Sequence, residues 1–167
     1  QGRADEAWQL AEGALWAYTG SPDTYEAFVC RSVLADVALE NNELNRAENL
    51  FSDLAETGER RQFRVPLAMV YFGLAYIHLV TDRKETGIKH ACKALELIEP
   101  TKAFQLFIDQ GERSRVVCNA LVEAGYKGPF LNRVLENLPG KKKPAAITIA
   151  NQSVIHIKTL GTFQVFA

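Results

Sequence analysis

The sequence predicts an all-α fold, in which antiparallel helix pairs of about 40 residues stack into a superhelix, followed by a short C-terminal β-hairpin tail. Two observations favour this fold. The chain of 167 residues has 47% hydrophobic and 23% charged residues, which is typical of a globular protein that buries a core. Shifting the sequence against itself by 40 residues also brings apolar or small residues into register.

The 40-residue register covers both halves of each unit. In the first halves, Leu34 falls on Leu74 and Val37 on Ile77. In the second halves, three rows of small or apolar residues coincide: Ala7, Ala47 and Gly87; Ala11, Phe51 and Ala91; Ala14, Leu54 and Ala94. Steps of three or four between such residues indicate an amphipathic helix. We therefore expect second helices at 3–17, 43–57 and 84–98, and more apolar first helices at about 22–41 and 60–81.

Turn and cap residues fall where these helices should end. Ser21-Pro22-Asp23 is predicted to begin a first helix, and Asn41-Asn42 and Thr81-Asp82 to form the turns within pairs. Gly58 and Pro100 are predicted to close second helices. After Pro100 the period fades, and we expect short helices at 101–109, 112–124 and 127–138 to cap the stack. The helical domain is thus predicted to span residues 1–138.

The composition changes after residue 138. Residues 139–153 are predicted to be a linker, since Pro139, Pro144 and the run Lys141–Lys143 oppose a helix. Val154–Lys158 and Thr162–Phe166 are strand candidates around Leu160-Gly161. Because two strands cannot bury a core, 154–167 is expected to begin a second domain, and the hairpin to pack on the helices or pair with a neighbouring chain.

Two segments resemble known bacterial regulators. The sequence Ile155–Val165, with Leu160-Gly161-Thr162-Phe163-Gln164-Val165, resembles the opening β-hairpin of the winged-helix (OmpR/SARP-type) DNA-binding domain in SARP (BTAD-associated) activators. Residues 84–138 resemble the end of the helical repeat region in MalT-like regulators, through Ala91, Ala94, Leu95, Glu99-Pro100 and Phe107–Gly111. Two departures are Gly87, in place of the usual alanine, and His90, where the other units have Leu10 and Leu50.

The resemblance implies a TPR-like repeat region in a multidomain bacterial transcriptional activator. It also implies an upstream nucleotide-binding domain, although no Walker A pattern occurs in this chain. DNA would then be bound only through a domain beyond residue 167. The function expected from the whole pattern is a non-catalytic, cytoplasmic module for signal sensing or protein interaction. The alternative is a free-standing scaffold solenoid unrelated to transcription.

Contacts are expected on the concave face, which the first helices line in such repeats. The candidate contacts to a protein partner or a small-molecule inducer are Ser32, Asp36, Met69, Phe72 and Tyr76. The same face is predicted to include Val29, Leu39, Glu40, Leu79 and Val80. The competing interpretation is that neighbouring helices cover these residues as ordinary core. Self-association is a further possibility.

Other reactive residue types suggest no enzyme or cofactor site in this fragment. His78 and His90 lack a further ligand at metal-binding spacing and are interpreted as ordinary helix histidines. Cys30, Cys92 and Cys118 are an odd number in apolar stripes, which favours inert thiols in a reducing compartment.

Charge and hydropathy indicate neither a polyanionic partner nor a membrane-spanning segment. The formal net charge is −1. The basic cluster Glu59-Arg60-Arg61 with Arg64 is interpreted as a solvated face at a helix start, and the alternative is a contact to a phosphate or an acidic partner. The longest apolar run, Val65–Val80, falls short of the roughly 20 residues that cross a bilayer. We therefore expect no membrane partner.

Overall fold

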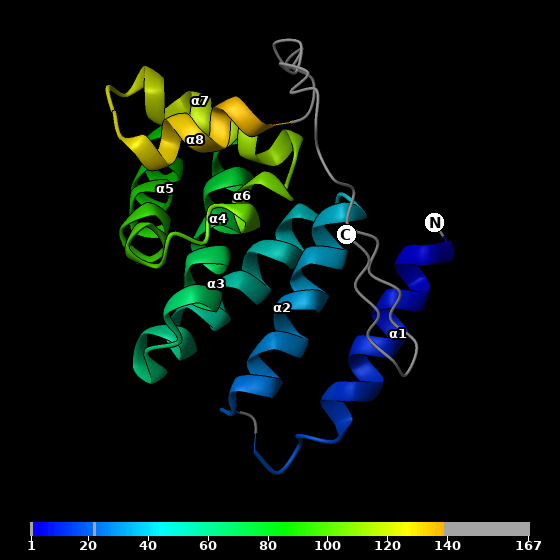
Figure 1. Cartoon of the computed structure of the whole chain (residues 1–167). Helices are drawn as coiled ribbons and strands as arrows, with labels where there is room; N and C mark the ends of the chain where they lie inside the picture. The colour runs from blue at the N-terminus through cyan, green and yellow to red at the C-terminus, as the bar shows by residue number, and fades with distance from the viewer. Residues whose placement is uncertain (1, 22, 139–167) are drawn as a thin grey trace, which may run out of the picture.

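The computed structural model describes residues 2–21 and 23–138, and the regular elements in these residues are all helical (Figure 1). They are α1 (Gly2–Trp16), α2 (Tyr25–Glu40), α3 (Leu44–Arg61), α4 (Arg64–Val80), α5 (Lys84–Ile98), the 3-10 helix η1 (Glu99–Thr101), α6 (Gln105–Ile108), α7 (Glu112–Glu123) and α8 (Pro129–Asn137). The predicted all-α class is confirmed for this part of the chain. The predicted linker 139–153 and tail 154–167 lie outside the described residues.

The long helices pack against their neighbours in chain order. Helix α1 lies against α2, α2 against α3, α3 against α4 and α4 against α5, with consecutive helices running in opposite directions (Figure 1). At the far end from α1, α7 packs against both α4 and α5, and α8 packs against α6 and α7. The first helices α2 and α4 also touch each other. The chain therefore forms a layered stack that the short C-terminal helices close.

The turns repeat at the same 40-residue interval as the sequence pattern. Asn42 and Asp82, which follow α2 and α4, have φ angles of 61° and 59°. Gln62 and Lys102, which follow α3 and the α5–η1 segment, have φ angles of 57° and 56°. Asparagine and aspartate tolerate this left-handed conformation better than most residues do. The turns predicted at Asn41-Asn42 and Thr81-Asp82 are confirmed.

The prediction that Gly58 closes a second helix is wrong, because α3 continues through it to Arg61. The helix ends at Gln62, whose left-handed conformation caps it. A Cβ atom at position 58 would lie 2.8 Å from Cδ1 of Leu67. Glycine is needed here for the close approach of α4 and not for a turn. The cluster Arg60-Arg61 consequently lies at a helix C-terminus, where both side chains pair with Asp23.

The start of α2 also differs from the prediction. The backbone N–H of Ala27 donates to Oγ1 of Thr24 at 3.3 Å, so Thr24 caps the helix in place of Ser21. Pro22 lies outside the described residues. The predicted stop at Pro100 is confirmed, since α5 ends at Ile98 and Pro100 lies in η1.

Buried aromatic rings connect the helix pairs to the cap. The Phe51 ring of α3 lies over Gly73 of α4, where an added Cβ would be 2.7 Å from the ring. Phe72 of α4 meets Phe107 of α6 edge to face, with ring centroids 4.7 Å apart, and Phe107 meets Phe130 of α8 at 5.7 Å. One core therefore runs from α3 into α8.

The apolar run Val65–Val80 forms most of α4, which neighbouring helices cover. Among residues 2–21 and 23–138, no helix has both the length and the apolar content needed to cross a bilayer.

Candidate functional site

Four of the five candidate contacts line one small hollow between α2 and α4. Ser32 and Asp36 come from α2, and Met69 and Phe72 come from α4. Their spacing of three or four residues puts each pair on one face of its helix. Tyr76, one turn beyond Phe72, lies at the edge of this site, where the Arg113 guanidinium is 6.0 Å from its ring centre. The structure therefore brings the sequence-predicted residues together.

The five side chains differ in accessibility. Ser32, Asp36, Met69 and Tyr76 are half-buried, and the Ser32 hydroxyl donates to the Phe28 carbonyl at 2.9 Å. Phe72 is 2% exposed because Phe107 of the cap covers its ring. A ligand cannot reach Phe72 in this arrangement, so its role is to support the floor of the hollow.

Arg113 of α7 is the residue of this site that sequence analysis missed. Its side chain, 15% exposed, enters the hollow from the cap. The Nη2 atom donates to the carboxylate of Glu40, and Nη1 lies 3.5 Å from Oδ1 of Asp36. The signal for this contact would have been a basic residue just after Gly111, at the start of the predicted capping helix. Its partners lie 73 and 77 residues away, which no local pattern reveals.

The carboxyl group of Asp36 is crowded by neighbouring helices but stays within reach of water. Its side chain keeps 51% of its surface exposed. Burial nevertheless raises the pKa of Asp36 to about 6, while the charge of Arg113 opposes that shift and the carboxylate of Glu40 adds to it. A positive charge placed beside this carboxyl group favours its ionised form.

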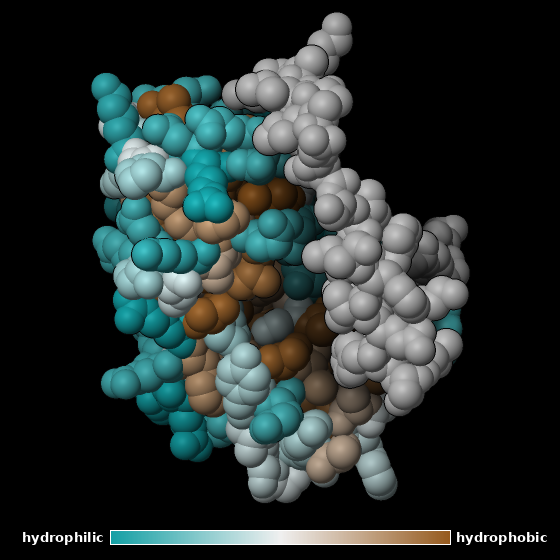
Figure 2. All heavy atoms as spheres, in the orientation of Figure 1, coloured by the Kyte–Doolittle hydropathy of each residue, from teal (hydrophilic) through white to brown (hydrophobic). Residues whose placement is uncertain are grey.

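Exposed apolar residues extend the site along α2. Tyr25, Val29 and Val33 are 50%, 39% and 41% exposed, and they continue the stripe that holds Asp36 and Glu40. Val80 at the end of α4 is exposed too, whereas Leu39 is buried and Leu79 is half-buried. Figure 2 shows hydrophobic side chains gathered in the middle of one face, where the surface is hollowed. We name the stripe Tyr25, Val29, Val33, Asp36 and Glu40 the α2 stripe.

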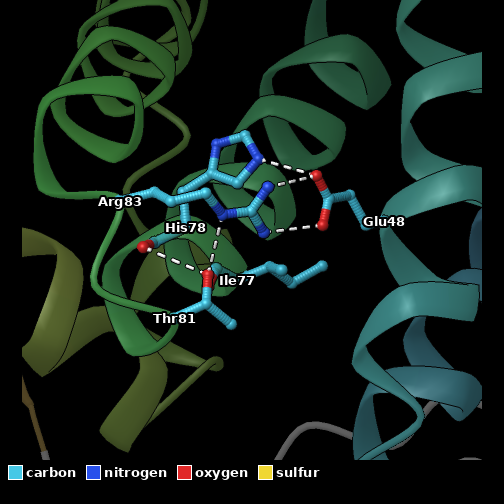
Figure 3. Close-up of polar contacts among 5 residues, drawn as sticks. All are labelled: Glu48, Ile77, His78, Thr81 and Arg83. Atoms are coloured by element: carbon cyan, nitrogen blue, oxygen red, sulfur yellow. Dashed lines mark hydrogen bonds and ion pairs between the residues drawn. The ribbon is translucent and has the colours of Figure 1, made fainter.

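A second polar cluster joins α3, α4 and the start of α5 (Figure 3). Both carboxylate oxygens of Glu48 accept hydrogen bonds of 2.7 Å from Arg83, and Oε1 lies 3.0 Å from Nε2 of His78. Nε of Arg83 also donates to the Thr81 hydroxyl, which donates to the Ile77 carbonyl. The Arg83 hydrogen bond lowers the pKa of Glu48 to about 2, with His78 adding to the effect. This cluster ties one helix pair to the next.

His78 and His90 stack beside that cluster, with ring centres 4.9 Å apart. The Nδ1 atoms of both rings are buried without a hydrogen-bond partner in the described part of the chain. Burial lowers the pKa of His90 to about 4, and the charges of His78 and Lys93 act in the same direction. Among the described residues, no three His, Cys, Asp or Glu side chains converge as metal ligands would.

A shallow depression of about 470 Å³ lies on another side, over α3, α4 and α5. Its walls include Glu59, Tyr71 and Lys93. The Lys93 ammonium donates to the Tyr71 hydroxyl and to Glu59, each at 3.1 Å, and the Tyr71 hydroxyl donates to Glu59. These three polar side chains pair with one another and link three helices.

The three cysteines of the described residues differ in burial. Cys118 is buried, and burial raises the pKa of its thiol to about 12. Cys30 and Cys92 are half-buried free thiols.

The chain matches no protein-family model, and a search of curated proteins gives no match. The resemblance to MalT-like and SARP regulators stays a prediction from the residues quoted for it.

Proposed function

We propose that this chain is a TPR-like superhelix, a right-handed stack of 40-residue helix pairs whose concave face binds a protein partner or a small-molecule inducer without catalysis. The observation that carries the proposal is the α2 stripe, in which three exposed apolar residues continue into two carboxylates. Contiguous exposed apolar surface beside charged residues is typical of binding faces. The repeated turn geometry supports a regular stack.

We also propose that the module belongs to a multidomain bacterial transcriptional regulator in the cytoplasm. This step rests on the resemblance of residues 84–138 and 155–165 to such regulators. In that setting, partner or inducer binding controls the effector domain, and DNA is bound by a domain beyond residue 167. A free-standing scaffold that shares the same binding face is the alternative.

The binding face is tested by a double substitution in the α2 stripe. Val29→Glu with Val33→Glu adds two charges to exposed positions, so the fold should persist, as far-UV circular dichroism would verify. The matched control is Val122→Glu, because Val122 is a similarly exposed valine on α7. The full chain, its double variant and the control are each used for affinity capture from the source organism, followed by mass spectrometry.

We expect a partner that wild type and Val122→Glu retain and the double variant loses. Equal capture by all three proteins would place binding elsewhere and contradict the proposal. The identity of the captured partner, together with the gene sequence downstream of codon 167, distinguishes a module of a transcriptional regulator from a free-standing scaffold. A helix-turn-helix pattern there supports the regulator, and its absence supports the scaffold.

A further inference from the structure

The hollow between α2 and α4 already holds a cationic side chain. Arg113 reaches it from the first turn of α7 and contacts Glu40, Asp36, Gln110 and the ring of Tyr76. Asp36 and Gln110 line the same hollow as the candidate binding residues Ser32, Met69 and Phe72. The hollow is thus built around a guanidinium group.

Arg113 leaves part of the negative charge unpaired. Its Nη1 atom is 3.5 Å from both Oδ1 of Asp36 and Oε1 of Gln110, which is at the outer limit of a hydrogen bond. One guanidinium therefore faces two carboxylates, of which Glu40 has the closer contact. Burial is the main cause of the raised pKa of Asp36, and the charge of Arg113 offsets it only in part.

The hollow has no space for a second group while Arg113 is present. The unfilled volume is about 20 Å³, enough for roughly one water molecule. A partner side chain that enters the hollow itself must therefore replace the Arg113 side chain. Helix α7 need not move for this, because Ser114, Val117 and Leu121 anchor it in the core.

We propose that Asp36 and Glu40 recognise an arginine side chain of the binding partner, which takes the place of Arg113. The proposal rests on the proposed function and names the chemistry of its partner. Arginine fits better than lysine, because a planar fork of donors can serve two carboxylates and lie over an aromatic ring. Val33 and Val29 next to Asp36 would contact apolar residues of the same partner segment.

The test removes Arg113 and supplies the guanidinium from solution. The full chain with Arg113→Ala is titrated with N-acetyl-arginine amide, and with N-acetyl-citrulline amide as the neutral isostere, by ¹H–¹⁵N NMR at pH 7.5. Arg113→Gln is a second variant that keeps a longer side chain against Tyr76, in case the alanine variant does not fold. Arg133→Ala is the matched control, because Arg133 stacks on Phe104 of the cap, away from the hollow.

We expect Arg113→Ala or Arg113→Gln to bind the arginine derivative at least about tenfold more tightly than the citrulline derivative, as a charge-assisted hydrogen bond would give. Wild type and Arg133→Ala should bind at least tenfold more weakly than these variants. Adding Asp36→Asn and Glu40→Gln should remove the preference for arginine.

Equal binding of the two derivatives by the Arg113 variants would overturn the proposal. So would wild-type binding as tight as that of the variants, because Arg113 would then not occupy the site. A further outcome is that the capture experiment yields a partner that depends on Val29 and Val33 while the Arg113 variants show no preference for the arginine derivative. That pair of results would refute this inference and leave the proposed function standing. Failure of that capture would count against the proposed function, whatever the titration shows.

Discussion

Replacing His90, which lies between α4 and α5, with leucine is expected to make the free energy of unfolding less sensitive to acid. His90 stacks on His78 and lies near Tyr71, Lys93 and Glu48, and its Nδ1 atom has no partner. A positive charge on this ring is unfavourable, because it is partly buried and close to two other basic groups. Leucine is the residue at both equivalent repeat positions, Leu10 and Leu50.

The size and sign of the effect follow from the pKa of His90. It falls from 6.5 to about 4 on folding, so the unfolded chain takes up the proton first. The free energy of unfolding is therefore unaffected by His90 above pH 6.5 and decreases as the pH falls from 6.5 to 4. The full difference corresponds to about 3 kcal/mol. Because part of the ring remains in water, we expect about 2 kcal/mol.

Urea unfolding followed by far-UV circular dichroism at pH 7.5, 6.5, 5.5 and 4.5 measures this effect. Wild type should lose about 2 kcal/mol more than His90→Leu between pH 6.5 and 4.5. His90→Gln, which is polar but does not titrate there, is the control and should behave like the leucine variant. Comparing variants cancels the opposite contribution of Asp36, whose raised pKa favours folding at lower pH. Parallel pH profiles for wild type and both variants would refute the reasoning.

Two substitutions test the packing and capping, each by urea unfolding of the full chain. Gly73→Ala places a Cβ atom 2.7 Å from the Phe51 ring, so it should cost about 1–3 kcal/mol, whereas Gly13→Ala meets open space within α1 and should gain up to about 1 kcal/mol. Equal effects at the two glycines would show that the contact with Phe51 is unimportant. Thr24→Ala removes the acceptor for Ala27 N–H and should cost about 1 kcal/mol, while Thr24→Ser should cost less. A Thr24→Ala variant as stable as wild type would contradict the assigned cap.

Local patterns were sufficient to predict the helix pairs. Apolar spacing located the long helices, and the Asn41-Asn42 and Thr81-Asp82 turns were readable because their residues suit tight turns. Gly58 misled the prediction, because a glycine needed for close helix packing looks the same in sequence as one that ends a helix. Its role depends on Leu67, a residue of the next helix.

The candidate site could be predicted in part. The helical period placed Ser32, Asp36, Met69 and Phe72 around one hollow. It could not show that Phe107 covers Phe72 or that Arg113 pairs with Asp36, because both contacts depend on how the irregular cap folds back on α2 and α4. Sequence period predicts which face a residue occupies and not what covers that face.

The central claim is that the face formed by α2 and α4 binds the partner. Amide hydrogen exchange of the full chain, with and without the captured partner, tests this most directly. We expect slower exchange in Tyr25–Glu40 and Arg64–Val80, and a change at the first turn of α7 where Arg113 is displaced. Slower exchange confined to α3 and α5, with α2 and α4 unchanged, would contradict the claim.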